Sequence, residues 1–253
     1  EGENGEILSG WRLRNSNKAA RIPEKHSETA FMTNRAMEFI EESKDKPWFL
    51  HLSYIKPHWP YMAPAPYHNM YSANEFYPVH RNDAERNNDH PVYKAFMENS
   101  ISKTFSKDEV RNTVLSGYMG LIKQIDDNLG RLFKFLEDTG HMEDTMIVFT
   151  SDHGDYQGDH WLGEKELFHE QSVRVPMIIY DPSEHADKTR GTKEKRFIEA
   201  IDLLPTFLDA VESPVSKHRL EGNSLMPVIK GEDPKNWKDF VFSEIDYSFN
   251  EAR

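Results

Sequence analysis

A polar loop between two apolar runs constrains the fold of this chain more than any other feature. The stretch "MIVFTSDHGDYQGDHWLGEKELFHEQSVRVPMIIYDP" (residues 146–182) opens with an apolar run that ends at Thr150, and a second apolar run starts at Val175. Short apolar runs bounded by turn residues are typical of buried strands. Titratable side chains crowd the segment between them, among them Asp152, His153, Asp155, Asp159, His160, Lys165, His169 and Glu170. This loop is therefore expected to contribute to a functional site.

Helical patterns flank these strands. One helix is expected after Ser27, a candidate N-cap, because apolar residues recur there at helical spacing until Pro47 ends the pattern. A longer helix is expected over residues 107–139, where apolar residues repeat with a period near 3.6 up to Gly140. A short helix is expected in "EAIDLLPTFLDAV", and further strands in "WFLHLSYI" (residues 48–55) and "DFVFSEIDY" (residues 239–247). Residues 61–105 are expected to be a long irregular excursion. This alternation predicts an α/β fold with a mostly parallel central sheet flanked by helices.

The domain organisation is expected to be simple. Residues 1–239 are predicted to form part of one α/β catalytic domain, and residues 240–253 a final strand and the start of a smaller C-terminal subdomain. The opening "EGENGEILSGWRLRNSNKAA" resembles the interior of a loop-rich region, and no signal peptide is apparent. We therefore expect a fragment with an incomplete sheet. A cytoplasmic location is the first expectation, and a periplasmic or secreted one is the alternative.

Composition excludes several classes of function. The formal net charge is −12, from 43 acidic and 31 basic residues, which argues against a nucleic-acid partner. It does not exclude a small anionic substrate, because a bound cation or a local lysine can outweigh the global charge. No apolar run is long enough to span a membrane, so no membrane partner is expected. The absence of cysteine excludes disulfides and thiolate zinc sites.

Two chemically rich segments follow predicted strands. "KPHWP" comes after the strand ending at Ile55, and "SDHGD" after the strand ending at Thr150. Ligands of open α/β sheets bind at the carboxyl ends of the strands. The adjacent Asp152 and His153 can both reach one divalent cation, since carboxylate oxygen and imidazole nitrogen suit borderline ions. The alternative is an aspartate that caps the next turn beside a surface histidine.

Two further residues are candidates for catalysis. Lys165 can stabilise anionic oxygens of a substrate as a compact positive charge; the alternative is a solvated surface lysine. His58, with Pro57 before it and Pro60 shortly after, can protonate a leaving-group oxygen as general acid. The alternative is a histidine packed between Trp59 and Tyr61. Asp159 and Glu170 are expected to form local hydrogen bonds or to pair with Arg174, and His160 to support the site or to line its entrance.

Together the segments "TSDHGDYQGDHWLGEK", "FLHLSYIKPHWPY" and "IKQIDDNLGRLFKFLEDTG" resemble the sulfatase branch of the alkaline phosphatase superfamily. Within that branch, "PHWPYMAPAPYHNMY" and the "GDHWLGEK" spacing are most similar to the phosphonate monoester hydrolases and phosphodiesterases. The resemblance covers most of the chain from about residue 27. It implies an alkaline-phosphatase-like fold, with Asp152 and His153 as metal ligands, Lys165 on the substrate's oxygens and His58 as general acid.

The same resemblance implies the cofactors and the reaction. One divalent metal ion is expected (Mn, Zn or Ca), together with a formylglycine nucleophile made from a Cys/Ser-x-Pro-x-Arg motif upstream of this chain. The substrate would be a small anionic ester: a phosphonate, a phosphodiester or a sulfate. An arylsulfatase-type activity is one alternative, and a non-catalytic binding module with this fold is another. Related transferases and mutases also carry "DHG", but "KPHWP" with "GEK" favours a hydrolase. A homo-oligomer is left open.

The chain departs from the family pattern in the elements that surround the nucleophile. It contains no cysteine and no Cys/Ser-x-Pro-x-Arg segment, and the upstream aspartate ligand of the family is missing as well. These elements lie in the N-terminal part of the family. The sequence therefore predicts half of a metal site and no nucleophile.

Overall fold

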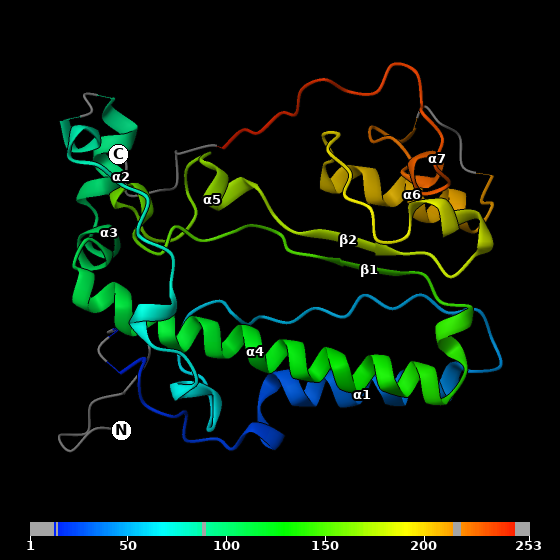
Figure 1. The fold of residues 1–253 in the computed structure, drawn as a ribbon, viewed down its shortest axis with the longest axis horizontal. Helices are drawn as coiled ribbons and strands as arrows, with labels where there is room; N and C mark the ends of the chain where they lie inside the picture. Colours follow the sequence, from blue (N-terminus) through cyan, green and yellow to red (C-terminus); the bar gives the residue numbers. More distant parts are fainter. Residues whose placement is uncertain (1–12, 14, 88–89, 215–218, 246–253) are drawn as a thin grey trace. The chain divides into compact units, whose positions relative to one another are not determined.

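The computed structural model describes residues 13, 15–87, 90–214 and 219–245, and the chain divides into two compact units (Figure 1). Among the described residues, the first unit comprises residues 13–139 and 154–173, and the second comprises residues 140–153 and 174–245. Across the described part of the chain, no helix is both long and apolar enough to cross a membrane.

Two long helices form the frame of the first unit. Helix α1 (Glu28–Ser43) packs along helix α4 (Asp108–Asp138), as Figure 1 shows. The side chain of Ser27 caps α1 by accepting a hydrogen bond from the backbone N–H of Ala30, and it also accepts one from Gln124 of α4 at 2.7 Å. Gly140 follows α4 with a left-handed φ of 80°. Both helices predicted from periodicity are confirmed.

The excursion over residues 61–105 contains more helix than the sequence predicted. Helix α2 (Pro91–Glu98) starts with a proline in its first turn, and helix α3 (Ser100–Phe105) is capped by Asn99, which accepts from Ser102 N at 2.8 Å. Such short helices contain too few turns to show a periodic apolar stripe. Their ends are therefore set by local capping. The shorter 3₁₀ helices of this unit are η2 (Glu24–His26), η3 (Tyr67–Asn69), η4 (Ala73–Glu75), η5 (Asp83–Asn87) and η7 (Asp159–Trp161); helix α5 spans Glu170–Val173.

The proline-rich segment that follows His58 lies directly on α4. Tyr61 is 2% exposed and packs with Leu13, Phe105 and Val114 in one apolar cluster. Gly117 of α4 permits this approach, because a Cβ there would fall on the carbonyl oxygen of Tyr61. The helix thereby fixes the backbone three residues after a predicted catalytic side chain.

The expected strand at residues 48–55 is not assigned as a strand. The segment nevertheless alternates, with Trp48, Leu50, Leu52 and Tyr54 half-buried and the residues between them exposed. A period of two shows extended backbone. The prediction of a strand was wrong for the described structure because no neighbouring segment pairs with this one in a regular ladder.

The second unit is built on a two-stranded sheet. Strand β1 (Ile147–Thr150) pairs antiparallel with β2 (Met177–Tyr180), with Ile147 opposite Tyr180 and Thr150 opposite Met177. Both strands were predicted, although this pair is antiparallel; mostly parallel sheets commonly carry such a pair. The remaining helices of the unit are η6 (His141–Glu143), η8 (Glu184–Thr189), η9 (Ala200–Asp202), α6 (Leu203–Ala210) and α7 (Met226–Ile229).

A buried carboxylate joins η9 to loop residues of the second unit. Asp202 is fully buried, and its two oxygens accept hydrogen bonds from Lys238 Nζ at 2.8 and 2.9 Å and from the backbone N–H groups of Glu199 and Asn223. The expected final strand at 240–253 is not found over residues 240–245, and residues 246–253 lie outside the described part.

Candidate active site

The predicted metal ligands follow β1 directly. Asp152 is exposed at 85% of its side chain and His153 at 33%, and His153 Nε2 lies 3.5 Å from Asp152 Oδ2. Asp152 Oδ1 accepts from the backbone N–H of His153 at 3.0 Å, while Ser151 donates to the carbonyl oxygen of His153 at 2.8 Å. These local bonds turn the chain, so that two consecutive side chains point to one side instead of alternating as they would in a strand.

The donor set at this turn suits half of a metal site. A carboxylate oxygen beside an imidazole nitrogen fits one Mn²⁺ or Zn²⁺ ion, and the exposed Asp152 is accessible to it. Within the described residues no group of three or more His, Cys, Asp or Glu side chains is arranged to hold a metal. Further ligands for such an ion would therefore have to come from outside the described residues.

In the first unit, His58 is held in a defined orientation. It lies between the cis peptide bonds Lys56–Pro57 and Trp59–Pro60. Its Nδ1 is 2.9 Å from the carbonyl oxygen of Trp59. A carbonyl oxygen only accepts, so Nδ1 carries the proton, and in the neutral ring Nε2 carries the lone pair.

Lys165 lies against that free nitrogen. Its Nζ is 3.4 Å from His58 Nε2 and 3.4 Å from Glu164 Oε2. Only 29% of the Lys165 side chain is exposed, which excludes the alternative of a fully solvated surface lysine. The backbone is fixed as well, since its carbonyl oxygen accepts from Ser172 Oγ and its N–H donates to Glu166 Oε2 at 3.0 Å.

The loop that carries Lys165 has an unusual backbone. Four non-glycine residues within eight positions have positive φ: Gln157 (47°), His160 (55°), Trp161 (62°) and Glu164 (64°). Cross-loop bonds hold this conformation, with Tyr156 N donating to Glu164 O at 2.8 Å and Gly158 N to Leu162 O at 2.9 Å. Left-handed backbone at non-glycine residues persists only where surrounding contacts impose it, and it is common at functional sites.

Asp155 is a member of the site that sequence reasoning missed. Its Oδ2 accepts a hydrogen bond from Tyr61 Oη at 2.7 Å, and its Oδ1 accepts from Gln157 N at 3.1 Å. Loss of water around the carboxylate raises the pKa of Asp155 to about 6, and the nearby Glu164 adds to this. Burial also raises the pKa of Tyr61, so its hydroxyl stays protonated and donates. The second aspartate of "SDHGD" was visible in the sequence, but nothing there indicated its partner.

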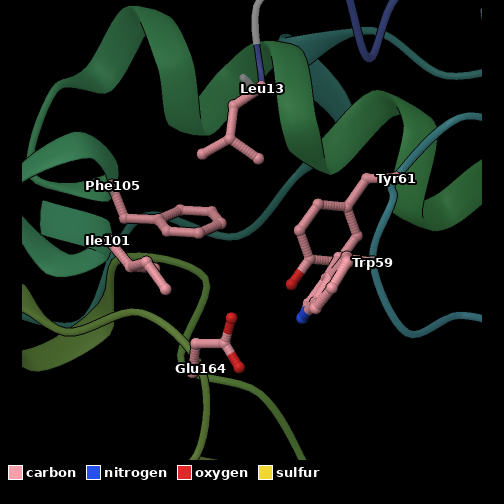
Figure 2. A pocket seen from close by; sticks show the side chains of 6 residues that line it. All are labelled: Leu13, Trp59, Tyr61, Ile101, Phe105 and Glu164. Carbon is pink, nitrogen blue, oxygen red and sulfur yellow. The ribbon is translucent and has the colours of Figure 1, made fainter. Parts of the chain in front are cut away.

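A small cavity lies beside these residues. It has a volume of about 20 Å³, room for about one water molecule. Figure 2 shows the Tyr61 hydroxyl and the indole nitrogen of Trp59 on the side of the cavity nearest the Glu164 carboxylate. Apolar side chains of Leu13, Ile101 and Phe105 close the rest. The cavity is too small for an ester substrate, so it is a packing void among these side chains.

Histidines of the same loop form a second cluster. The rings of His160 and His169 stack with centroids 4.1 Å apart. His160 Nδ1 is 2.9 Å from Glu85 Oε1, and His169 Nδ1 is 2.7 Å from Tyr156 Oη. Burial, and then the neighbouring His160, lower the pKa of His169. This cluster connects the loop to the excursion over residues 61–105.

The structure thus brings the predicted residues together in two pairs. His58 and Lys165 meet in the first unit, and Asp152 and His153 meet in the second. His58 also packs on Trp59, with ring centroids 5.1 Å apart, so the packing expected as the alternative is present together with the contact to Lys165. The catalytic and metal roles of these four residues stay predictions.

Comparison with known proteins identifies relatives. The sulfatase family profile matches residues 5–213. The multifunctional alkaline phosphatase superfamily protein PehA of Trinickia caryophylli is 35% identical over 92% of this chain and 47% of its own length. An arylsulfatase of Clostridium perfringens is 30% identical over 88% of this chain and 45% of its own length.

A solved structure supports the same relationship. The phosphonate monoester hydrolase of Silicibacter pomeroyi superposes with a TM-score of 0.84 at 32% identity, covering 92% of this chain and 47% of that one. This likeness confirms the alkaline-phosphatase-like α/β fold. The chain spans about half the length of these relatives.

Proposed function

The chain belongs to the sulfatase family, and on this premise we propose that the complete protein hydrolyses small anionic esters. Phosphonate monoesters and phosphodiesters are the preferred substrates in this proposal, and sulfate esters, as for an arylsulfatase, are the alternative. The similarity to a phosphonate monoester hydrolase over 92% of the chain supports this order. A non-catalytic binding module of the same fold is the competing proposal of another class.

One observation carries the proposal. Lys165 Nζ and His58 Nε2, 107 residues apart in sequence, lie 3.4 Å from each other. An ammonium group beside an imidazole nitrogen offers a charge for the substrate's anionic oxygens and a proton carrier for its leaving group. Neither a binding module nor a structural protein needs such a pair to be partly shielded from water.

The residues of this chain would divide the work as follows. The Lys165 ammonium binds a non-bridging oxygen of the phosphonate, phosphate or sulfate and stabilises the charge that grows there. His58, protonated at Nε2, gives that proton to the leaving oxygen as its bond to phosphorus or sulfur breaks. The Nδ1–H bond to Trp59 O keeps the Nε2 edge directed at the reacting group throughout.

Two groups beyond these residues complete the proposal. Asp152 and His153 would hold one divalent cation (Mn, Zn or Ca), which supplies charge that polarises the ester oxygens. A formylglycine would supply the nucleophile, and it would have to lie outside these 253 residues, which contain no cysteine and no Cys/Ser-x-Pro-x-Arg motif. A cytoplasmic location and the absence of nucleic-acid and membrane partners remain proposals based on the sequence.

The test uses the complete protein and a panel of aryl and alkyl phosphonates, phosphodiesters and sulfates. Lys165→Ala should lower kcat/KM by roughly a hundredfold, the usual effect of losing one oxyanion donor. Lys134→Ala, on the exposed face of α4, is the matched control and should leave the rate unchanged. A loss below about twofold for Lys165→Ala would remove it from the mechanism.

The metal content of the protein gives a second, independent test of the proposed function. Asp152→Asn and His153→Ala should lower the bound metal measured by elemental analysis while the thermal unfolding midpoint changes little, since Asp152 is exposed. Metal and turnover retained in both variants would refute the site. An upstream sequence without a Cys/Ser-x-Pro-x-Arg motif, together with no turnover on the panel, would favour the binding module.

A further inference from the structure

The contact between His58 and Lys165 is too long to fix the positions of the two side chains by itself. Its 3.4 Å separation exceeds the usual range of about 2.7–3.2 Å for a strong N–H hydrogen bond. The two side chains belong to segments that are far apart in the sequence. Some other interaction must fix the distance between those segments.

Hydrogen bonds hold the segment of His58 in place up to Tyr61. Lys56 Nζ donates to the carbonyl oxygens of both His58 and Pro60, each at 3.1 Å. His58 N in turn donates to Ile55 O at 3.0 Å. Tyr61 then anchors the segment, because its ring is 2% exposed and meets Phe105 and Tyr118 edge-on at centroid distances of 6.2 and 6.0 Å. A displacement of Tyr61 is therefore transmitted to His58.

The segment of Lys165 is likewise connected to Asp155. Tyr156, the next residue, donates its N–H to Glu164 O at 2.8 Å, and Glu164 precedes Lys165. Gly154 on the other side donates to Ser172 O at 2.7 Å, and Ser172 Oγ bonds the carbonyl oxygen of Lys165. Asp155 thus lies at the point from which the backbone of Lys165 is held.

A short hydrogen bond joins these two segments, from Tyr61 Oη to Asp155 Oδ2 at 2.7 Å. With it the contacts close into a ring: His58 leads to Tyr61 along the chain, Tyr61 bonds Asp155, Tyr156 bonds Glu164, and Lys165 returns to His58. We propose that the Tyr61–Asp155 hydrogen bond is a positioning contact that sets His58 against Lys165 for protonation of the leaving group. Its kinetic part rests on the proposed function.

Tyr61→Phe removes the hydroxyl and keeps the ring in the apolar cluster. Tyr67→Phe is the matched control, since Tyr67 is also buried, belongs to the same excursion, and donates to an aspartate, Asp127 Oδ2, at 2.9 Å. Asp127 keeps Lys123 as a partner at 2.7 Å and lies on α4, outside the ring of contacts. Both variants lose one tyrosine–carboxylate hydrogen bond, but only Tyr61→Phe loses the proposed positioning.

The kinetic test compares leaving groups. Tyr61→Phe in the complete protein should lower kcat/KM by about tenfold or more for esters with poor, alkoxide-like leaving groups, and by less than about threefold for nitrophenyl esters, which need little protonation. A plot of log kcat/KM against leaving-group pKa should steepen, as it should for His58→Gln. In the His58→Gln background Tyr61→Phe should have little further effect, because the two act through one group.

A nuclear magnetic resonance measurement, which does not depend on turnover, separates this inference from the proposed function. The imidazole nitrogen resonances of His58 should shift in Tyr61→Phe and stay in place in Tyr67→Phe. If the wild type hydrolyses no ester on the panel but His58 responds in this way, the function fails and the positioning contact stands. If Tyr61→Phe matches Tyr67→Phe in resonances and rates, or if its loss persists undiminished without His58, the positioning role is refuted.

Asp155→Asn guards against a folding defect. It keeps the side-chain shape and exchanges the charged acceptor for a neutral amide oxygen, which accepts the Tyr61 hydroxyl more weakly, so it should steepen the leaving-group dependence in the same direction as Tyr61→Phe and by a smaller factor. Unfolding midpoints of both variants within a few degrees of wild type establish that the comparison concerns folded protein. An Asp155→Asn variant that is folded and kinetically identical to wild type would contradict the proposal.

Discussion

A methyl group added at Gly117 tests how closely α4 approaches the segment that carries His58. The Cβ of Gly117→Ala would fall on the carbonyl oxygen of Tyr61 and lie 2.8 Å from that of Ser16. Ordinary van der Waals contact begins at 3.4 Å, so Ser16 alone must recede by about 0.6 Å. Both obstacles are backbone atoms, which cannot rotate away as a side chain would. The whole segment has to move.

The free-energy balance combines two opposing terms. Replacing a mid-helix glycine by alanine stabilises a helix by about 1 kcal/mol. Overpacking a well-packed interior costs about 1–3 kcal/mol and more where backbone must shift. Because Gly117 meets two backbone oxygens, we expect the upper end of that cost and a net loss of about 1–2 kcal/mol. Gly130 lies on the same helix with nothing within 4 Å of its Cβ position, so Gly130→Ala should gain close to the full 1 kcal/mol.

The assay is thermal unfolding of the complete protein, wild type and both variants, under identical buffer and metal. For a unit of this size about 1 kcal/mol shifts Tm by about 2–4 °C. Gly117→Ala should therefore melt about 2–8 °C lower and Gly130→Ala about 2–4 °C higher. Ester hydrolysis should fall in Gly117→Ala alone, since only that variant displaces Tyr61. Equal stabilisation by both substitutions would show that α4 does not press on the segment, and the reasoning would fail.

Two further perturbations probe other parts of the chain. Because burial and His160 lower the pKa of His169, the folded state binds fewer protons there than the unfolded state does. The free energy of unfolding therefore keeps its full value above pH 6.5, the ordinary pKa of histidine, and decreases as the pH falls through the lowered pKa of His169. His169→Gln should make this decrease smaller. Urea unfolding measured from pH 8 to pH 5 tests it. Lys238→Ala leaves the carboxylate of Asp202 buried without its cation, so the unfolding free energy should drop by about 3 kcal/mol, whereas Lys134→Ala on the α4 surface should change it little. A near-wild-type Lys238→Ala protein would show that the backbone N–H groups suffice for Asp202.

Much of the fold was predictable where sequence pattern is local. The stripe over residues 107–139 and the Ser27 cap predicted α4 and α1, because amphipathic period and capping act within one segment. The apolar runs predicted β1 and β2 for the same reason. Residues 48–55 show the limit: their period of two was real, but a strand also needs a neighbour, which no single segment encodes.

The candidate site shows the same division. Lys165 and His58 stood out by type and by position after apolar runs, and the structure brings them within 3.4 Å. Asp155 and Tyr61 did not stand out as a pair, because 94 residues separate them and each has an ordinary local context. Only the tertiary contact between Tyr61 and Asp155 indicates that these two residues act together.

The left-handed residues of the Lys165 loop bear on how this protein could be engineered. Gln157, His160, Trp161 and Glu164 each hold a backbone conformation that glycine adopts at lower cost. A library selected for thermal stability alone would therefore be drawn toward glycine at these positions. At His160, Trp161 and Glu164 such a gain would remove a side chain that bonds to or stacks on a neighbour, so stability and activity should be selected together there. In this loop, backbone conformations that lower the folding stability hold the side chains of the candidate site in position.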